Sequence, residues 1–190
     1  MTDGAPVAGV PVDDADDDGE ALDRLAALVR DVPDFPEPGV VFRDITPVLA
    51  DAAAFTMLSV ALGALVGEAD LVVGVEARGF LLGAAAALTA GTGIVPIRKA
   101  GKLPRVAASR SYALEYGTAT LELPADTVAP GARVLVVDDV LATGGTAAAA
   151  CDLVAAAGAE VVGFAVMIEL VALGGRARLD GVPVHALLTY

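Results

Sequence analysis

The stretch that decides the fold reads Arg133-Val-Leu-Val-Val-Asp-Asp-Val-Leu-Ala-Thr-Gly-Gly-Thr146. Apolar and β-branched residues lead into two adjacent carboxylates, small residues follow, and an Ala-rich segment over residues 147–157 ends at Gly158. This order predicts a buried strand, a short loop and a helix.

The loop of this stretch (residues 142–146, the small-residue loop) has the properties of a phosphate-binding site. Its residues are small enough for backbone N–H groups to converge on one oxyanion, at a helix N-terminus whose dipole favours negative charge. Two hydroxyl groups can add further donors. A side chain at Gly144 is expected to fill space that the phosphate needs and to leave the fold intact. The expected phosphate contacts are Ala142, Thr143, Gly144, Gly145 and Thr146.

The two carboxylates before this loop, Asp138 and Asp139, would repel a bare phosphate. They fit a ligand that carries hydroxyl groups or a metal next to its phosphate, as ribose 5-phosphate does. No Lys follows the glycines, which excludes the G-x-x-x-x-G-K-[ST] loop of nucleotide triphosphatases. The competing interpretation is an ordinary turn between strand and helix with incidental acids.

Composition limits the partners and the location of the protein. With 12 basic and 25 acidic residues among 190, the net charge is −13, which argues against nonspecific binding to nucleic acid or to an anionic membrane. Residues 79–97 carry no charge, but glycines and a proline interrupt them, so we expect a buried helix and strand rather than a membrane span. The single cysteine, Cys151, and the absence of a basic, apolar leader predict a cytoplasmic protein.

The rest of the chain predicts a single domain over residues 20–190 behind a disordered acidic tail, residues 1–19. A helix over residues 52–66 is expected to be capped by Asp51, and strands are expected at 71–75, 93–98, 118–123, 160–170 and 184–190. Arg78 follows the first of these strands, at the edge where open α/β sheets bind ligands. Three cations, Arg98, Lys99 and Lys102, begin a long polar segment that we expect to be functional.

Residues 133–146 closely resemble the phosphoribosyl diphosphate (PRPP) signature of the type I phosphoribosyltransferase family. The resemblance extends over about residues 20–190, with local departures such as Val140 in the signature. It implies an α/β fold with a mainly parallel central sheet flanked by helices. It also implies a small N-terminal hood at about residues 33–48, and a flexible flap at about 98–117 that closes over the site.

Residues 40–47 resemble the hood of the adenine phosphoribosyltransferases within that family. The resemblance implies that Phe42 stacks on adenine, that Val41 and Arg43 read its edge, and that Leu170 lies against the opposite face. The alternative for Phe42 is a core residue beneath a loop.

The same resemblance assigns the remaining site residues. Pyrophosphate is expected to contact Ala77 and Arg78 together with Arg98, Lys99 and Lys102. The flap residue Glu115 is expected to handle the proton of adenine, and it joins Arg78, Asp138 and Asp139 as the catalytic set. The alternative is that Glu115 pairs with Arg110 or Lys102 and only shapes the flap.

The reaction implied is purine salvage, in which adenine and PRPP give AMP and pyrophosphate with Mg²⁺. Because Mg²⁺ dehydrates reluctantly, we expect substrate oxygens and water to hold it, and we assign it no protein ligand. The resemblance also implies a homodimer. Two alternatives stay open: a 6-oxopurine or xanthine phosphoribosyltransferase, and a noncatalytic regulator that senses PRPP.

Overall fold

The computed structural model describes residues 17–113 and 117–190, and the chain divides into two units, residues 1–54 and 55–190. The expectation of one domain over residues 20–190 stays a prediction.

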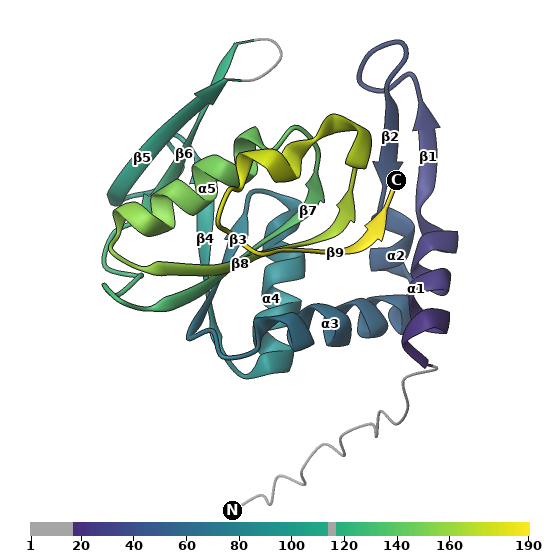
Figure 1. Cartoon of the computed structure of the whole chain (residues 1–190), viewed down its shortest axis with the longest axis horizontal. Helices are drawn as coiled ribbons and strands as arrows, with labels where there is room; N and C mark the ends of the chain where they lie inside the picture. Colours follow the sequence, from purple (N-terminus) through teal and green to yellow (C-terminus); the bar gives the residue numbers. More distant parts are fainter. Residues whose placement is uncertain (1–16, 114–116) are drawn as a thin grey trace, which may run out of the picture. The chain divides into compact units, whose positions relative to one another are not determined.

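The first unit contains helix α1 (Asp17–Leu28), strands β1 (Arg30–Pro33) and β2 (Val41–Asp44), and the short helix α2 (Thr46–Ala50) (Figure 1). Helix α1 begins at Asp17, so it includes the last three residues of the predicted acidic tail. Residues 1–16, where the rest of the tail was predicted, lie outside the described residues.

Strands β1 and β2 pair antiparallel, with Val32 opposite Phe42 and Asp31 opposite Arg43. The sequence analysis gave these residues no strands, because segments of four residues are too short for an alternating pattern to show. The proline-rich connection between them, residues 34–40, is irregular.

The second unit is built on a seven-stranded sheet in the order β5-β6-β4-β3-β7-β8-β9. The strands from β4 to β9 in this order run parallel, while β6 pairs antiparallel with β4 and β5, so the predicted mainly parallel sheet is confirmed. The strand bounds are β3 Leu71–Val75, β4 Gly93–Lys99, β5 Val106–Ala113, β6 Thr118–Pro124, β7 Arg133–Leu141, β8 Glu160–Glu169 and β9 Val184–Thr189.

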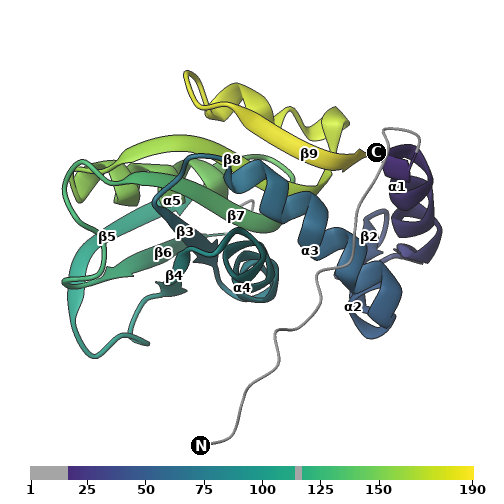
Figure 2. The same cartoon turned by 90° about the horizontal axis from the view of Figure 1, so that it is seen from below.

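Helix α3 (Ala52–Val66) starts as expected, because the backbone N–H of Ala54 donates to Asp51 Oδ1 at 2.8 Å. Helix α4 (Arg78–Ala90) links β3 to β4, and helix α5 (Gly145–Ala156) links β7 to β8. In the strand order, the chain passes from β3 to β4 in one direction and from β7 to β8 in the other. Because such crossovers are right-handed, helices α4 and α5 lie on opposite faces of the sheet (Figures 1 and 2). The crossover direction reverses between β3 and β7, and ligands of such folds bind at the carboxyl ends of the strands at this point.

The core of the second unit consists of aliphatic side chains from the central strands around Phe164, which is fully buried. The uncharged residues 79–97 belong to α4 and β4, as expected. None of the helices in residues 17–113 and 117–190 is long and apolar enough to cross a membrane.

The segment expected to be a flexible flap contains strand β5, which pairs with β6 along its length as a hairpin. No strand was predicted for residues 106–113, and a surface hairpin was the alternative to the flap. Serine and arginine obscure the alternation there, although Ser111 and Thr120 lie opposite each other and their hydroxyl oxygens are 2.8 Å apart.

Candidate active site

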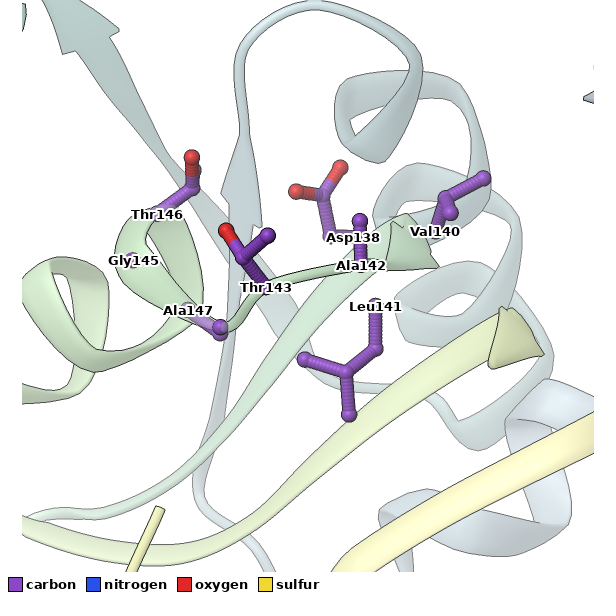
Figure 3. Close-up of a pocket in the computed structure, with 9 residues that line it drawn as sticks. Asp138, Val140, Leu141, Ala142, Thr143, Gly145, Thr146 and Ala147 are labelled. Carbon is purple, nitrogen blue, oxygen red and sulfur yellow. The ribbon is translucent and has the colours of Figure 1, made fainter. Parts of the chain in front are cut away.

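The small-residue loop lies where strand β7 ends and helix α5 begins. Together with Asp138 it lines a pocket, and the side chains of Asp138, Thr143 and Thr146 point to one side of the chain while Leu141 points away from them (Figure 3). The first N–H groups of a helix lack partners within the helix, so those at the start of α5 are available to an anion. The structure therefore brings the five residues predicted to bind phosphate together.

Position 144 requires a glycine for a different reason from the one expected. Its φ of +81° lies in the left-handed region, and a Cβ built on it would lie 2.3 Å from the carbonyl oxygen of Gly175. The side chain would thus strike the backbone behind the loop, so the expectation that a substitution only fills the phosphate space was wrong. Gly175 was not recognised from the sequence, because its contact with the loop crosses some thirty residues of chain.

The two acids at the end of β7 are both buried. Asp138 Oδ1 accepts a hydrogen bond from the backbone N–H of Asp139 at 2.8 Å. Burial, and then the charge of Asp139, raise the pKa of Asp138 well above its usual value. Both causes disfavour the charged form of this carboxyl group.

Arg78 lies beside these acids, with its Nε 3.0 Å from Asp139 Oδ2. That carboxylate oxygen is buried and accepts no hydrogen bond from the described residues. Close packing puts the arginine there: a Cβ on Gly79 would lie 2.8 Å from the carbonyl oxygen of Val137, so the first turn of α4 packs directly against β7. Ala77, at the N-terminus of this helix, is placed on the same edge.

The cation cluster is held by a carboxylate that the sequence analysis overlooked, Glu76. Its carboxylate accepts a hydrogen bond from the backbone N–H of Lys99 at 2.9 Å, pairs with the ammonium group of Lys102, and lies 3.5 Å from Arg98 Nε. Burial acts to raise the pKa of Glu76, but the hydrogen bonds from Lys102 and Lys99 and the charges of Lys102 and Arg98 outweigh it, and the pKa is lowered. The Lys99 side chain is exposed, and no ion pair is found for it among the described residues.

Strand β5 contacts the helix that follows the small-residue loop. The Thr146 hydroxyl donates to the phenol oxygen of Tyr112 at 3.1 Å, and the Tyr112 ring lies 3.3 Å from a Cβ built on Gly145. Two residues earlier on the strand, Arg110 pairs with Asp152 of α5 at 2.6 Å. Tyr112 was missed because nothing in the sequence relates residue 112 to residue 146. Glu115 lies outside the described residues.

In the first unit, the predicted base-binding residues lie on β2. The Phe42 ring makes an edge-to-face contact with Phe35, with centroids 5.2 Å apart. The Arg43 guanidinium pairs with Asp31, and Val41 is exposed. Phe42 is only half-buried.

In the second unit, Leu170 directly follows β8, and its backbone N–H donates to the carbonyl oxygen of Leu141 at 2.9 Å. The predicted base contact of the second unit is thus joined to the end of β7, next to the small-residue loop.

Comparison with known proteins gives a family for this arrangement. The model of the phosphoribosyl transferase domain matches residues 47–179. The adenine phosphoribosyltransferase of Saccharopolyspora erythraea is 59% identical over 179 residues, which are 94% of this chain and 98% of the relative.

Solved structures are similar over the same extent. The adenine phosphoribosyltransferase of Thermoanaerobacter pseudethanolicus superposes with a TM-score of 0.86 at 45% identity, covering 89% of this chain and 99% of its own. The adenine phosphoribosyltransferase of Saccharomyces cerevisiae was solved with adenine and an imino-altritol bisphosphate. It superposes with a TM-score of 0.85 at 37% identity, covering 90% of this chain and 99% of its own.

Proposed function

Since this chain belongs to the phosphoribosyltransferase family, and its relatives are adenine phosphoribosyltransferases, we propose how its residues divide that reaction among them. The enzyme transfers the 5-phosphoribosyl group from PRPP to adenine, giving AMP and pyrophosphate. The alternatives of a 6-oxopurine transferase and a noncatalytic sensor find no support in these relatives. The observation that carries the proposal is the anion pocket of the small-residue loop beside two buried acids and Arg78.

The 5-phosphate binds the N–H groups and the two threonine hydroxyls of residues 142–146. The ribose hydroxyls bind Asp138 and Asp139. Support comes from the pocket, which Asp138 lines together with the small-residue loop, because carboxylate oxygens accept hydrogen bonds from hydroxyl groups.

Pyrophosphate binds the N-terminus of α4 at Ala77 and Arg78, together with Arg98, Lys99 and Lys102. An anion here finds two of these cations paired with Glu76. Pyrophosphate carries more charge than one carboxylate, so it competes with Glu76 for them. The guanidinium of Arg78 suits this role because its planar fork can bind phosphate oxygens in two places.

The proposed adenine contacts are Phe42, Val41 and Arg43 in the first unit and Leu170 in the second. This assignment rests on the family resemblance and on the yeast relative, which was solved with adenine. The contact with Phe35 supports it, because it restrains the Phe42 ring before a base arrives.

Glu115 takes the proton that adenine N9 loses when it attacks the anomeric carbon. Such groups typically contribute about 10²–10⁴ in rate. The competing role as a flap-shaping partner is weakened because both cations named for it have other carboxylates: Arg110 pairs with Asp152, and Lys102 with Glu76.

Mg²⁺ fits the oxygen donors of this site. No group of three acidic, histidine or cysteine side chains in the described residues could hold it alone, so PRPP oxygens and water are its proposed ligands. When bound, the ion neutralises charge on the leaving pyrophosphate. A homodimer is proposed from the family resemblance alone, and a cytoplasmic location is proposed from the single cysteine, which fits a reducing compartment.

An adenine-dependent pyrophosphate release assay tests the function. Hypoxanthine, guanine and xanthine are each tested in place of adenine. We expect turnover with adenine and little with the others, and equal turnover with all four would refute the assignment. Glu115→Leu should lower kcat by about 10²–10⁴ while PRPP affinity stays within a few-fold. The control is Glu68→Leu, which removes an exposed carboxylate that pairs with Arg133 at the start of β7, the far end of the strand from the site.

A further inference from the structure

The segment after β8 has no assigned role beyond Leu170. It forms two short 3₁₀ turns, η1 (Val171–Leu173) and η2 (Gly175–Arg178). A Cβ built on Gly175 would lie 2.2 Å from the carbonyl oxygen of Ala142 and 2.9 Å from the backbone nitrogen of Gly144. The two backbones are therefore in direct contact, and the position of η2 determines how far back the small-residue loop can move.

An ion pair fixes η2 to the sheet. Arg176 Nε donates to Glu169 Oε1 at 3.0 Å, Nη2 donates to the second carboxylate oxygen, and Nη1 donates to the carbonyl oxygen of Val184 at 2.8 Å. Glu169 is buried, whereas the Arg176 side chain is half exposed. A two-pronged guanidinium contact restrains orientation as well as distance, which a lysine does not do.

Glu169 is itself held on both sides. It is the last residue of β8, where it lies opposite Leu141 of β7 and Thr189 of β9. The chain of contacts runs from the sheet through Glu169 and Arg176 to Gly175, and from Gly175 to the backbone of the small-residue loop.

We propose that Arg176 and Glu169 are positioning residues for the 5-phosphate. They hold Gly175 against the small-residue loop, so that the N–H groups of the loop converge before the ligand arrives and little ordering is left to do on binding. The proposal rests on the proposed phosphate role of this loop. It predicts a selective effect: ligands with a 5-phosphate bind more weakly when the pair is broken, while adenine does not.

The test compares Arg176→Met, Arg176→Lys and Glu169→Gln with the wild-type protein. The matched control is Arg178→Met on the same turn, because Arg178 is exposed and no ion pair is found for it among the described residues. Calorimetry with ribose 5-phosphate and with PRPP gives the affinities, and steady-state assays give kcat and the KM for adenine.

We expect Arg176→Met and Glu169→Gln to lower the affinity for ribose 5-phosphate and for PRPP on the order of tenfold. The loss of a residue that supports a ligand has an effect of this size at metal sites. The value of kcat at saturating PRPP and the KM for adenine should stay within about twofold, and Arg176→Lys should restore part of the affinity. If Arg176→Met does not fold, Arg176→Lys carries the test through the shift in Tm that ribose 5-phosphate produces.

Unchanged affinity for ribose 5-phosphate in a folded variant would overturn the proposal, as would an equal loss for adenine. A wild-type protein that binds neither ribose 5-phosphate nor PRPP would instead refute the proposed function. The two failures are thus distinguishable.

Discussion

Replacing Gly144 by alanine tests the contact behind the small-residue loop most directly. The added Cβ would meet the carbonyl oxygen of Gly175 at 2.3 Å and the carbonyl carbon and Cα of Gly175 at 3.0 Å. All three are backbone atoms, so no flexible side chain can move aside, and either the loop or η2 must shift.

Two costs add in this variant. A residue with a Cβ in the left-handed region costs about 1–2 kcal/mol, and overpacking a filled site typically costs about 1–3 kcal/mol. The sum is about 2–5 kcal/mol, a large part of the roughly 5–15 kcal/mol that stabilises a typical protein. For a chain of this size it corresponds to a fall in Tm of roughly 4–20 °C.

Urea unfolding and ribose 5-phosphate calorimetry measure the two consequences, with Gly131→Ala as the control. Gly131 has a nearly equal φ of +79°, but nothing lies within 4 Å of its built Cβ. Gly131→Ala should therefore lose only the stability that the left-handed backbone conformation costs a residue with a Cβ, and it should keep its phosphate affinity. Gly144→Ala should lose more stability and bind the phosphate more weakly.

Equal losses of stability in the two variants would show that the contact with Gly175 is not what requires glycine. Intact stability with abolished binding would restore the original expectation that the Cβ fills only the phosphate space.

Three further predictions concern other parts of the chain. Phe42→Ala should raise the KM for adenine more than that for PRPP, because base stacking is worth about 1–3 kcal/mol, and equal effects would place Phe42 in the core. Glu76→Gln should be less stable than wild type at pH 7. Because the folded pKa of Glu76 lies below its usual 4.5, the difference in unfolding free energy between wild type and variant should narrow as the pH falls below 4.5. A difference that stays constant with pH would contradict the ion-pair assignment. Burial raises the pKa of Cys151 to about 12, so iodoacetamide at pH 8 should label it only after unfolding, and rapid labelling of the native protein would show that α5 opens.

The sequence predicted those parts of the fold that depend on local pattern. Strand β3 and helix α3 have the predicted bounds, because a continuous apolar run and an Asp cap define them within a few residues. The β1–β2 hairpin and strand β5 were missed, since their pairing is set by partners elsewhere in the chain and their own residues show no clean alternation.

The site divides in the same way. Residues 142–146 and Arg78 could be predicted as site residues because small residues and an arginine follow predicted strands. Glu76, Tyr112 and Gly175 were not, because their importance comes from contacts across 26, 34 and some thirty residues. Residue type alone does not reveal such contacts.

The pairing of Glu76 with Arg98 and Lys102 has a kinetic consequence. When a PRPP anion approaches this chain of net charge −13, two of the three cations of the cluster, Arg98 and Lys102, are already paired with Glu76. Long-range forces therefore slow the encounter, and Arg98 and Lys102 attract the ligand fully only once it displaces the carboxylate. Added salt shortens the Debye length from about 30 Å at 0.01 M to about 10 Å at 0.1 M, so the association rate constant for PRPP should rise over that range.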